Sequence, residues 1–360
     1  MGYVGPRVVR RLRQSHPDAI LVGFDMGYFG NCLTAADILP ECRVDLQYFG
    51  DVRRFPGELL NNVQAIVHLA AISNDPMGSM FEQVTHDVNY CATVQLAATA
   101  KEAGVRSFVF PSSCSVYGFF DGKVKTEESS VEPLTAYARS KVMAERDLTS
   151  LADRNFTVTC LRFATACGMS DRLRLDLVLN DFVASAVTCQ RIVVLSDGTP
   201  WRPLIHVTDM ARALDWAVTR ESSVGGDCLI VNAGSDPWNY QVKDLAQAVG
   251  EIIPKVHVSI NKNAQPDKRS YRVSFRRFAS LAPDYQPEVH LVQAVTELKE
   301  GLEMMEFKDR EFRNSSLVRL AVLKNLQTKG LLTDALEWRE RGARDDGKKD
   351  TYSTEQTSEA

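Results

Sequence analysis

Short apolar runs alternate with helical patterns through the first half of this 360-residue chain. The runs are rich in Val, Ile, Leu and Phe, and they lie at residues 19–25, 65–71, 107–110 and 156–163. Helical patterns occupy intervening segments, most clearly residues 80–103 and 135–152. Strands that alternate with helices pair in parallel, with the helices packed on the faces of the sheet. The first half therefore predicts a doubly wound α/β fold around a parallel sheet.

The chain begins with Met1-Gly2-Tyr3-Val4-Gly5 and passes directly into a helical pattern at residues 8–12. Gly2 and Gly5 have the G-x-x-G spacing that closes a dinucleotide fingerprint, in which a tight loop and a helix N-terminus meet a diphosphate. The strand that usually precedes this loop would lie before residue 1. We therefore expect a sheet that lacks its usual first strand and has unpaired neighbouring edges. We favour a natural start further upstream; a weakly active truncation and another segment in the gap are the alternatives.

Acidic and small residues follow the next apolar runs. Asp25 ends a run about 20 residues after the glycines, where an acid can accept hydrogen bonds from an adenosine ribose and would repel a 2′-phosphate. This position favours NAD over NADP, and a turn-forming Asp is an equally weighted alternative. Asp51 and Val52 follow a short strand and could meet an adenine ring, and small residues at 70–71 would let a cofactor lie close.

Tyr137 and Lys141 carry the candidate chemistry. Their spacing of four places both side chains on one face of a helix, one turn apart. An ammonium beside a phenol favours the phenolate, so we expect Lys141 to lower the pKa of Tyr137 and make it an acid/base near neutral pH. Ser113 follows the run at 107–110 and would lie at the carboxyl end of a strand, where open α/β sheets place their sites. Y-x-x-x-K alone also occurs by chance on solvated helices.

Composition limits the remaining classes of function. The net charge of −4 gives no nucleic-acid footprint, and no apolar run reaches the roughly 18 residues of a membrane span. No signal peptide is seen at the start, and the eight cysteines contain no C-x-x-C pair, so they indicate reduced residues of a cytoplasmic protein. The six histidines show no metal-ligand spacing, and we expect no metal.

The rhythm of strands and helices changes after residue 168. We expect residues 1–168, with 204–235 returning to it, to form the dinucleotide domain. Residues 169–203 and 236–342 would form a smaller C-terminal α/β domain with a helical cover, and residues 343–360 would be a disordered tail. Arg269 belongs to a basic cluster that is either a solvated face or a diphosphate site.

Taken together, these motifs resemble the extended short-chain dehydrogenase/reductase family, in its branch of nucleotide-sugar epimerases and dehydratases. The similarity covers about residues 2–305. It rests on these motifs, in order: Gly2-Tyr3-Val4-Gly5, Asp25, Gly50-Asp51, His68-Leu69-Ala70-Ala71, Asn89, Ser112-Ser113-Cys114-Ser115-Val116-Tyr117-Gly118, Tyr137 with Lys141, Leu161-Arg162-Phe163, and Arg202 with Ile205-His206-Val207 and Asp209.

The resemblance implies a role for each matching position. Ser113, Tyr137 and Lys141 would be catalytic. The cofactor NAD would be bound by Gly2, Tyr3, Val4, Gly5, Asp25, Asp51, Val52, Leu69, Ala70, Ala71, Asn89, Tyr137, Lys141 and Phe163. A nucleotide-diphosphate sugar would be bound by Ser113, Cys114, Ser115, Asn180, Arg202 and Arg269. The fold would be Rossmann-type, and a homodimer would form through a four-helix bundle of the segments 80–103 and 135–152.

The resemblance also implies transient oxidation of the sugar by NAD. Tyr137 would take the hydroxyl proton, and re-reduction of the ketone after rotation would give an epimer. In the 4,6-dehydratases of the family an Asp-Glu pair follows the serine or threonine, whereas Cys114 and Ser115 stand here. We therefore expect an epimerase, with a keto-reductase, a dehydratase or a weakly active scaffold as alternatives. Thr165 stands where many relatives have Asn, which changes the hydrogen bonding near the sugar.

Overall fold

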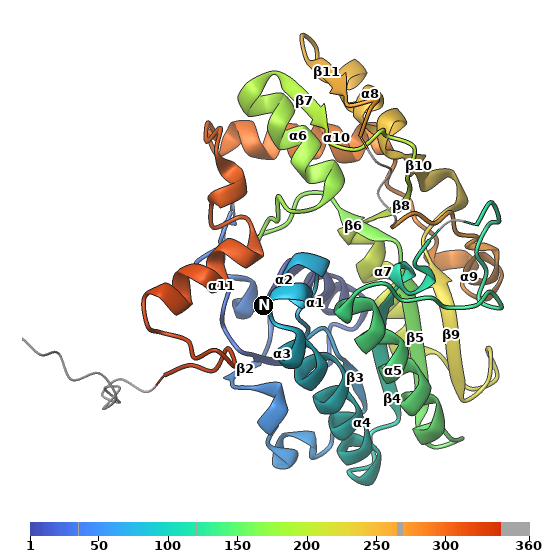
Figure 1. Cartoon of the computed structure of the whole chain (residues 1–360). Coiled ribbons are helices and arrows are strands. Elements are labelled where there is room, and N and C mark those ends of the chain that lie inside the picture. Colours follow the sequence, from blue (N-terminus) through green and yellow to red (C-terminus); the bar gives the residue numbers. More distant parts are fainter. Residues whose placement is uncertain (35, 120, 265–268, 340–360) are drawn as a thin grey trace, which may run out of the picture.

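The computed structural model describes residues 1–34, 36–119, 121–264 and 269–339. Its largest sheet has four parallel strands in the order β3 (Ala65–Val67), β4 (Ser107–Ser113), β5 (Thr157–Phe163) and β9 (Cys228–Ala233) (Figure 1). β5 is in register with β4 from Ser107 opposite Thr157 to Ser113 opposite Phe163. Ser113 therefore lies at the carboxyl end of the sheet, as predicted. The tail predicted at 343–360 lies outside the described residues.

Helices cover both faces of this sheet. Phe108 and Phe110 of β4 pack in one apolar cluster with α4 (Ala92–Glu102) and α5 (Ala136–Leu151). Val109, which points to the opposite face of the pleat, belongs to the cluster that contains α1 (Gly5–Ser15) and α7 (Val207–Thr219). α1 and α7 also contact each other. Two helical layers around a parallel sheet confirm the predicted doubly wound α/β fold.

The sheet is split next to β3. β1 (Val22–Asp25) and β2 (Leu46–Phe49) form a separate parallel pair. Among the described residues no pairing joins β1 to β3, and residues 21–24 and 64–67 line the same cavity. The side chain of Val22 is 45% exposed. This arrangement agrees with the expectation of a sheet that lacks a strand beside β3.

The single helix predicted at residues 80–103 is interrupted. The chain forms α2 (Asp75–Met80) and α3 (Glu82–His86), then a wider π-helical turn (Asp87–Cys91), and only then α4. Asn89 lies in the π turn, where its side chain accepts a hydrogen bond from the backbone amide of Ile72 and donates one to the Ile72 carbonyl. These bonds tie the turn to the loop that follows β3, a contact between segments 17 residues apart in the sequence.

The second part of the chain contains small sheets and covering helices. One sheet has the order β10 (Asn239–Gln241), β8 (Trp201–His206) and β6 (Thr165–Cys167), and β11 (His257–Ile260) pairs in parallel with β7 (Arg191–Val194). The helices of this part are α6 (Val178–Cys189), α8 (Val242–Ile252), α9 (Arg276–Leu281), α10 (Leu291–Met304) and α11 (Arg319–Thr328). α6, α8 and α10 gather around β7 and β11, whereas α11 packs against α2 of the first part (Figure 1).

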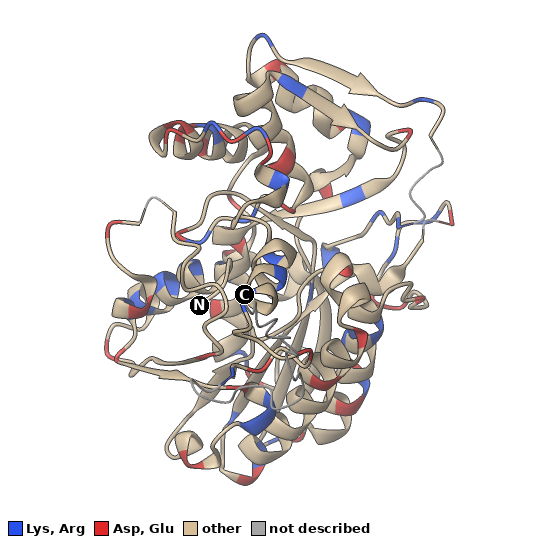
Figure 2. Cartoon of the chain, turned by 60° about the vertical axis from the view of Figure 1, so that its left-hand side comes forward, with Lys and Arg blue, Asp and Glu red and all other residues tan. Residues whose placement is uncertain are grey.

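Charges of both signs are interspersed over the helices (Figure 2). This distribution agrees with the small net charge of −4. Among the residues that the structure describes, no helix is both long enough and apolar enough to span a bilayer.

Candidate active site

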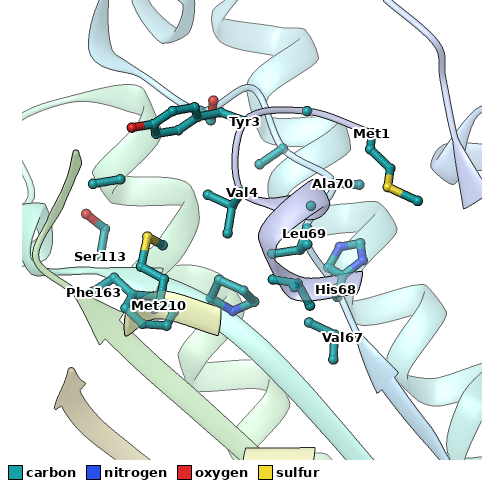
Figure 3. A pocket seen from close by; sticks show the side chains of 18 of the residues that line it. Met1, Tyr3, Val4, Val67, His68, Leu69, Ala70, Ser113, Phe163 and Met210 are labelled. Atoms are coloured by element: carbon teal, nitrogen blue, oxygen red, sulfur yellow. The ribbon is translucent and has the colours of Figure 1, made fainter. Parts of the chain in front are cut away.

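A cavity of about 2520 Å³ lies at the carboxyl ends of β3, β4 and β5 and extends between β1 and β3. Figure 3 shows Tyr3 and Val4 of the glycine loop, Leu69 and Ala70 after β3, and Ser113 at the end of β4 around it. Because the carboxyl edge of an open parallel sheet is where such folds bind ligands, this cavity is the candidate site.

The glycine loop enters the cavity wall directly before α1. The carbonyl of Val4 accepts hydrogen bonds from the amides of Arg7 and Val8, so the first turn of the helix begins at the loop. A side chain at Gly2 would meet no atom within 4 Å, which leaves open space beside the loop. A loop of this kind, open on one side and followed by a helix N-terminus, fits a dinucleotide diphosphate.

Tyr3 connects the glycine loop to residues 168–180. Its hydroxyl donates to the carbonyl of Gly168 at 2.6 Å, and Asn180 donates to that hydroxyl at 3.0 Å. The hydroxyl of Ser170 donates to the Tyr3 carbonyl at 2.6 Å. Asn180 also accepts from the Gly168 amide and is fully buried. Asn180 therefore holds the glycine loop in place and is not among the residues that line the cavity. The resemblance instead predicts a contact between Asn180 and the substrate.

The candidate acid/base lies on α5. Thr135 caps this helix by accepting from the amide of Ala138, and its hydroxyl donates to Asp75. Tyr137 and Lys141 follow in the first two turns, and the Lys141 ammonium lies 5.8 Å from the centre of the Tyr137 ring. Ser113, Tyr137 and Lys141 all line the cavity. The structure thus brings the three predicted catalytic residues to one place.

Their protonation differs from the prediction. Burial raises the pKa of Tyr137 to about 12, the nearby carboxylate of Asp75 adds to this rise, and a hydrogen bond with Ser113 opposes it. Burial also lowers the pKa of Lys141 to about 8. The Lys141 ammonium donates to the carbonyl of Pro111 at 2.8 Å and lies 4.3 Å from the centre of the Phe110 ring. The expected lowering of the Tyr137 pKa by Lys141 is therefore wrong for this structure, because burial is the largest influence on Tyr137 and it raises the pKa.

A buried ion pair holds α5 against the sheet. Glu145, one turn after Lys141, pairs with Arg162 of β5 at 2.7 Å and accepts from the hydroxyl of Ser112 at 2.5 Å. Arg162 also donates to the hydroxyl of Tyr117. The bonds fix the position of the helix that carries Tyr137 and Lys141. In the sequence, the spacing of four between Lys141 and Glu145 is the signal that places Glu145 on the same face of the helix.

The other predicted cofactor residues also lie mostly on the cavity wall. These are Gly2, Tyr3, Val4, Gly5, Asp25, Asp51, Val52, Leu69, Ala70, Ala71 and Phe163. Asp25 ends β1 and accepts from the amide of Gly27 at 2.6 Å, and Asp51 is bound by the guanidinium of Arg53. Asn89 is fully buried and is not part of the wall. Asn89 instead holds the loop after β3 in place through its two hydrogen bonds to the backbone of Ile72.

The predicted substrate residues separate into two groups. Arg202 and Arg269 line the cavity from distant segments, with the Arg202 guanidinium bonded to the Arg269 carbonyl and Arg269 paired with Asp75 at 2.9 Å. Ser115 also lines it, and its hydroxyl oxygen has no hydrogen-bond partner among the described residues. Cys114 does not belong to the wall: it is buried, and its thiol donates to the carbonyl of Arg162.

Sequence reasoning missed Arg174. Its guanidinium is buried, donates to Ser73 at 3.0 Å and pairs with Asp176 at 2.8 Å. Its positive charge opposes the rise in the pKa of Tyr137 that burial causes. Arg174 belongs to the polar segment Asp171-Arg172-Leu173-Arg174, which has no apolar pattern to predict a strand or helix. The signal that remained was the cluster of arginines in Arg172-Leu173-Arg174, which is hard to interpret before the loop is placed beside α5.

Known proteins resemble this chain in both sequence and fold. A model described as "NAD dependent epimerase/dehydratase family" matches residues 1–234, which is more than half of the chain. The chain belongs to the NAD-dependent epimerase/dehydratase family. The extended short-chain dehydrogenase/reductase resemblance is thereby confirmed, and NAD is the cofactor of this family.

The similar proteins include both reaction types. A UDP-glucose 4-epimerase of Neisseria gonorrhoeae is 27% identical over 84% of this chain and 92% of the relative. A dTDP-glucose 4,6-dehydratase of Streptomyces griseus is 27% identical over 64% of this chain and 73% of the relative. The crystal structure of a UDP-glucose-4-epimerase from Stenotrophomonas maltophila, with NAD and a formylated UDP-arabinopyranose, has a TM-score of 0.73 at 21% identity and covers 85% of this chain and 96% of that chain.

Proposed function

We propose that this protein is an NAD-dependent epimerase of a nucleoside-diphosphate sugar that acts through a transient keto sugar. The observation that carries the proposal is the convergence of Ser113, Tyr137 and Lys141 on the cavity that also contains the glycine loop and two arginines. The same cavity can thus hold a dinucleotide at the glycine loop and a second diphosphate at the two arginines. The proposed division of labour gives the first 168 residues to the cofactor and most of the remainder to the nucleotide sugar.

Tyr137 would exchange the proton of the sugar hydroxyl that is oxidised. The hydroxyl of Ser113 is hydrogen-bonded to Tyr137. It would also donate to the reacting oxygen of the sugar and so hold that oxygen close to the phenol of Tyr137. The buried ammonium of Lys141 would bind the nicotinamide ribose. NAD, when bound, supplies the acceptor for the carbon-bound hydrogen and returns that hydrogen to the ketone.

Arg202 and Arg269 would bind the diphosphate of the substrate. Both line the cavity, and the Arg202 guanidinium donates to the Arg269 carbonyl. The Arg269 guanidinium is bonded to Asp75, whose other carboxylate oxygen accepts from Thr135 next to α5. Guanidinium groups recognise phosphate oxygens through paired N–H donors. The contact would also place the sugar near Tyr137, because Asp75 and Thr135 connect the arginine to that helix.

Epimerisation is favoured over 4,6-dehydration by the residues after Ser113. Elimination of water from a keto sugar requires a base and an acid. Burial raises the pKa of the Cys114 thiol, and this thiol points to a backbone carbonyl. Ser115 presents only a hydroxyl. Neither position carries a carboxyl, which leaves rotation and re-reduction as the proposed fate of the ketone.

A Tyr137→Phe variant tests the assignment. Wild-type protein is incubated with NAD and, separately, UDP-glucose, UDP-glucuronic acid and UDP-N-acetylglucosamine, and products are separated by anion-exchange chromatography. We expect an epimer from at least one substrate, and a loss of about a hundredfold or more in Tyr137→Phe with NAD affinity retained. Unchanged turnover in the variant would refute the role of Tyr137.

The runner-up activities give different products. A keto-reductase consumes reduced nicotinamide in proportion to product, a dehydratase yields a deoxy-keto sugar, and a scaffold yields neither. The homodimer expected through the segments 80–103 and 135–152 is a further proposal, which sedimentation equilibrium of the purified protein tests.

A further inference from the structure

Arg319, the first residue of α11, is a buried cation with an unfilled donor. It is 1% exposed. Its Nη2 donates to the carbonyl of Arg172 at 2.7 Å, and its guanidinium carbon lies 4.7 Å from the centre of the Phe29 ring. Its Nη1 has no hydrogen-bond partner among the residues that the structure describes. Arg319 also forms part of the wall of the site cavity.

The neighbouring arginines form ion pairs, whereas Arg319 forms none with the described residues. Arg172 pairs with Glu41 at 2.8 Å, and Arg174 pairs with Asp176 at 2.8 Å. No carboxylate lies within ion-pair distance of Arg319 in the described part of the chain. Burial and the positive charge of Arg174 lower the pKa of Arg319 to about 10. A buried cation without a bound anion is unfavourable, so the pocket around Arg319 is suited to an anionic ligand.

The cluster borders the glycine loop. Glu41, the partner of Arg172, also accepts from the amino group of Met1 at 2.9 Å. Ser170, two residues before Arg172, donates to the carbonyl of Tyr3. Arg319 is therefore connected through Arg172 to both sides of the loop that receives a dinucleotide diphosphate. The arginines proposed for the substrate, Arg202 and Arg269, are instead connected to Asp75 and α5.

We propose that Arg319 binds a phosphate oxygen of the NAD diphosphate through its free Nη1. The cofactor would be closed on one side by the glycine loop and on the other by the start of α11. The C-terminal helical cover would then belong to the cofactor site and not only to the substrate site. α11 also lies beyond residues 1–234, the part that the family model matches. This inference does not depend on which reaction the keto sugar undergoes.

NAD and a nucleotide sugar both contain a diphosphate, so the experiment must distinguish which of the two Arg319 binds. Isothermal titration calorimetry measures the binding of NAD, ADP-ribose and UDP to the full chain and to Arg319→Met and Arg319→Lys variants. ADP-ribose reports the cofactor diphosphate without the nicotinamide, and UDP reports the substrate diphosphate. Arg310→Met is the matched control, because Arg310 is exposed, precedes α11 and does not line the cavity.

We expect Arg319→Met to weaken NAD and ADP-ribose by about tenfold to a hundredfold, as for loss of a charged hydrogen bond, and to leave UDP unchanged. Arg319→Lys should lose less, and Arg310→Met should lose nothing. Weakened UDP with unchanged ADP-ribose would overturn the proposal and assign Arg319 to the substrate. Equal affinities in Arg319→Met and the parent, or no binding of NAD or ADP-ribose by the parent, would also overturn it.

Thermal unfolding separates a binding role from a structural one. Removing an unpaired buried cation should leave the melting temperature of the ligand-free protein unchanged or higher, while the rise caused by saturating ADP-ribose becomes smaller. If ligand-free Arg319→Met instead melts lower than Arg310→Met, or does not fold, the guanidinium serves the fold itself and the proposal is wrong.

Discussion

Replacing Lys141 by Met should make the ligand-free protein more stable and less active. Lys141 is fully buried, and its pKa in the folded protein is lowered from 10.5 to about 8. Since one pKa unit corresponds to about 1.4 kcal/mol, keeping the ammonium charged in the fold costs about 3 kcal/mol at pH 7. Met lacks this charge and has a similar length. It also loses the hydrogen bond to Pro111, worth about 1 kcal/mol, so the net gain should be about 2 kcal/mol.

The gain should depend on pH with a definite sign. Because the folded pKa lies below the unfolded pKa, the unfolded chain binds more protons between pH 8 and 10.5, and wild-type stability contributed by this group rises through that window. The electrostatic cost is fully present below about pH 8 and falls to about 1.4 kcal/mol at pH 9.5. The stability difference between Lys141→Met and wild type should therefore be largest at pH 7 and nearly vanish at pH 9.5.

Urea unfolding at pH 7 and pH 9.5 measures this difference. Lys324→Met is the matched control, because Lys324 is exposed on α11 and should change stability by less than about 0.5 kcal/mol at either pH. Turnover of Lys141→Met should fall by about a hundredfold. A Lys141→Met protein that is less stable than wild type at pH 7, or a gain that does not shrink with pH, would refute the reasoning.

Three further substitutions test other parts of the account. Gly168 has φ +101° and a side chain there would lie 2.0 Å from His206, so Gly168→Ala should destabilise by about 2 kcal/mol or more in urea unfolding; an unchanged midpoint would contradict the geometry. Glu145→Ala leaves Arg162 buried without its carboxylate and should lower the free energy of unfolding by about 3–5 kcal/mol in the same measurement. A loss below about 1 kcal/mol would show that the ion pair is not needed for stability. Asp25→Ser should reduce the preference for NAD over NADP by about tenfold in calorimetric titrations, and an unaltered ratio would remove Asp25 from the ribose site.

The local features of the site followed from the sequence. Tyr137 and Lys141 are one helical turn apart, and a spacing of four determines their shared face whatever surrounds the helix. Ser113 follows an apolar run, which placed it at the end of a strand. The glycine loop could be predicted because Gly2 and Gly5 stand at the start of a helix. Each of these predictions uses residues that are close in the sequence.

The directions of several side chains could not be predicted in this way. Asn180 and Cys114 are adjacent to cavity residues, yet each turns to a backbone partner supplied by another segment. Asn89 lies in a π turn within the segment predicted as one helix, and its amide bonds the backbone of Ile72, 17 residues away. The raised pKa of Tyr137 arises from burial, which no local pattern reports. Arg319 becomes notable only when α11 is placed against the loop that contains Phe29.

The most direct test of the central claim follows the carbon-bound hydrogen of the substrate. The protein is incubated with NAD and UDP-glucose or UDP-glucuronic acid in deuterium oxide, and the products are analysed by proton NMR. The account predicts an epimer that retains hydrogen at the inverted carbon, with no net consumption of NAD and about a hundredfold less product, or still less, from Tyr137→Phe. A deoxy-keto sugar, solvent deuterium at the inverted carbon, or reduced nicotinamide accumulating in proportion to product would contradict it.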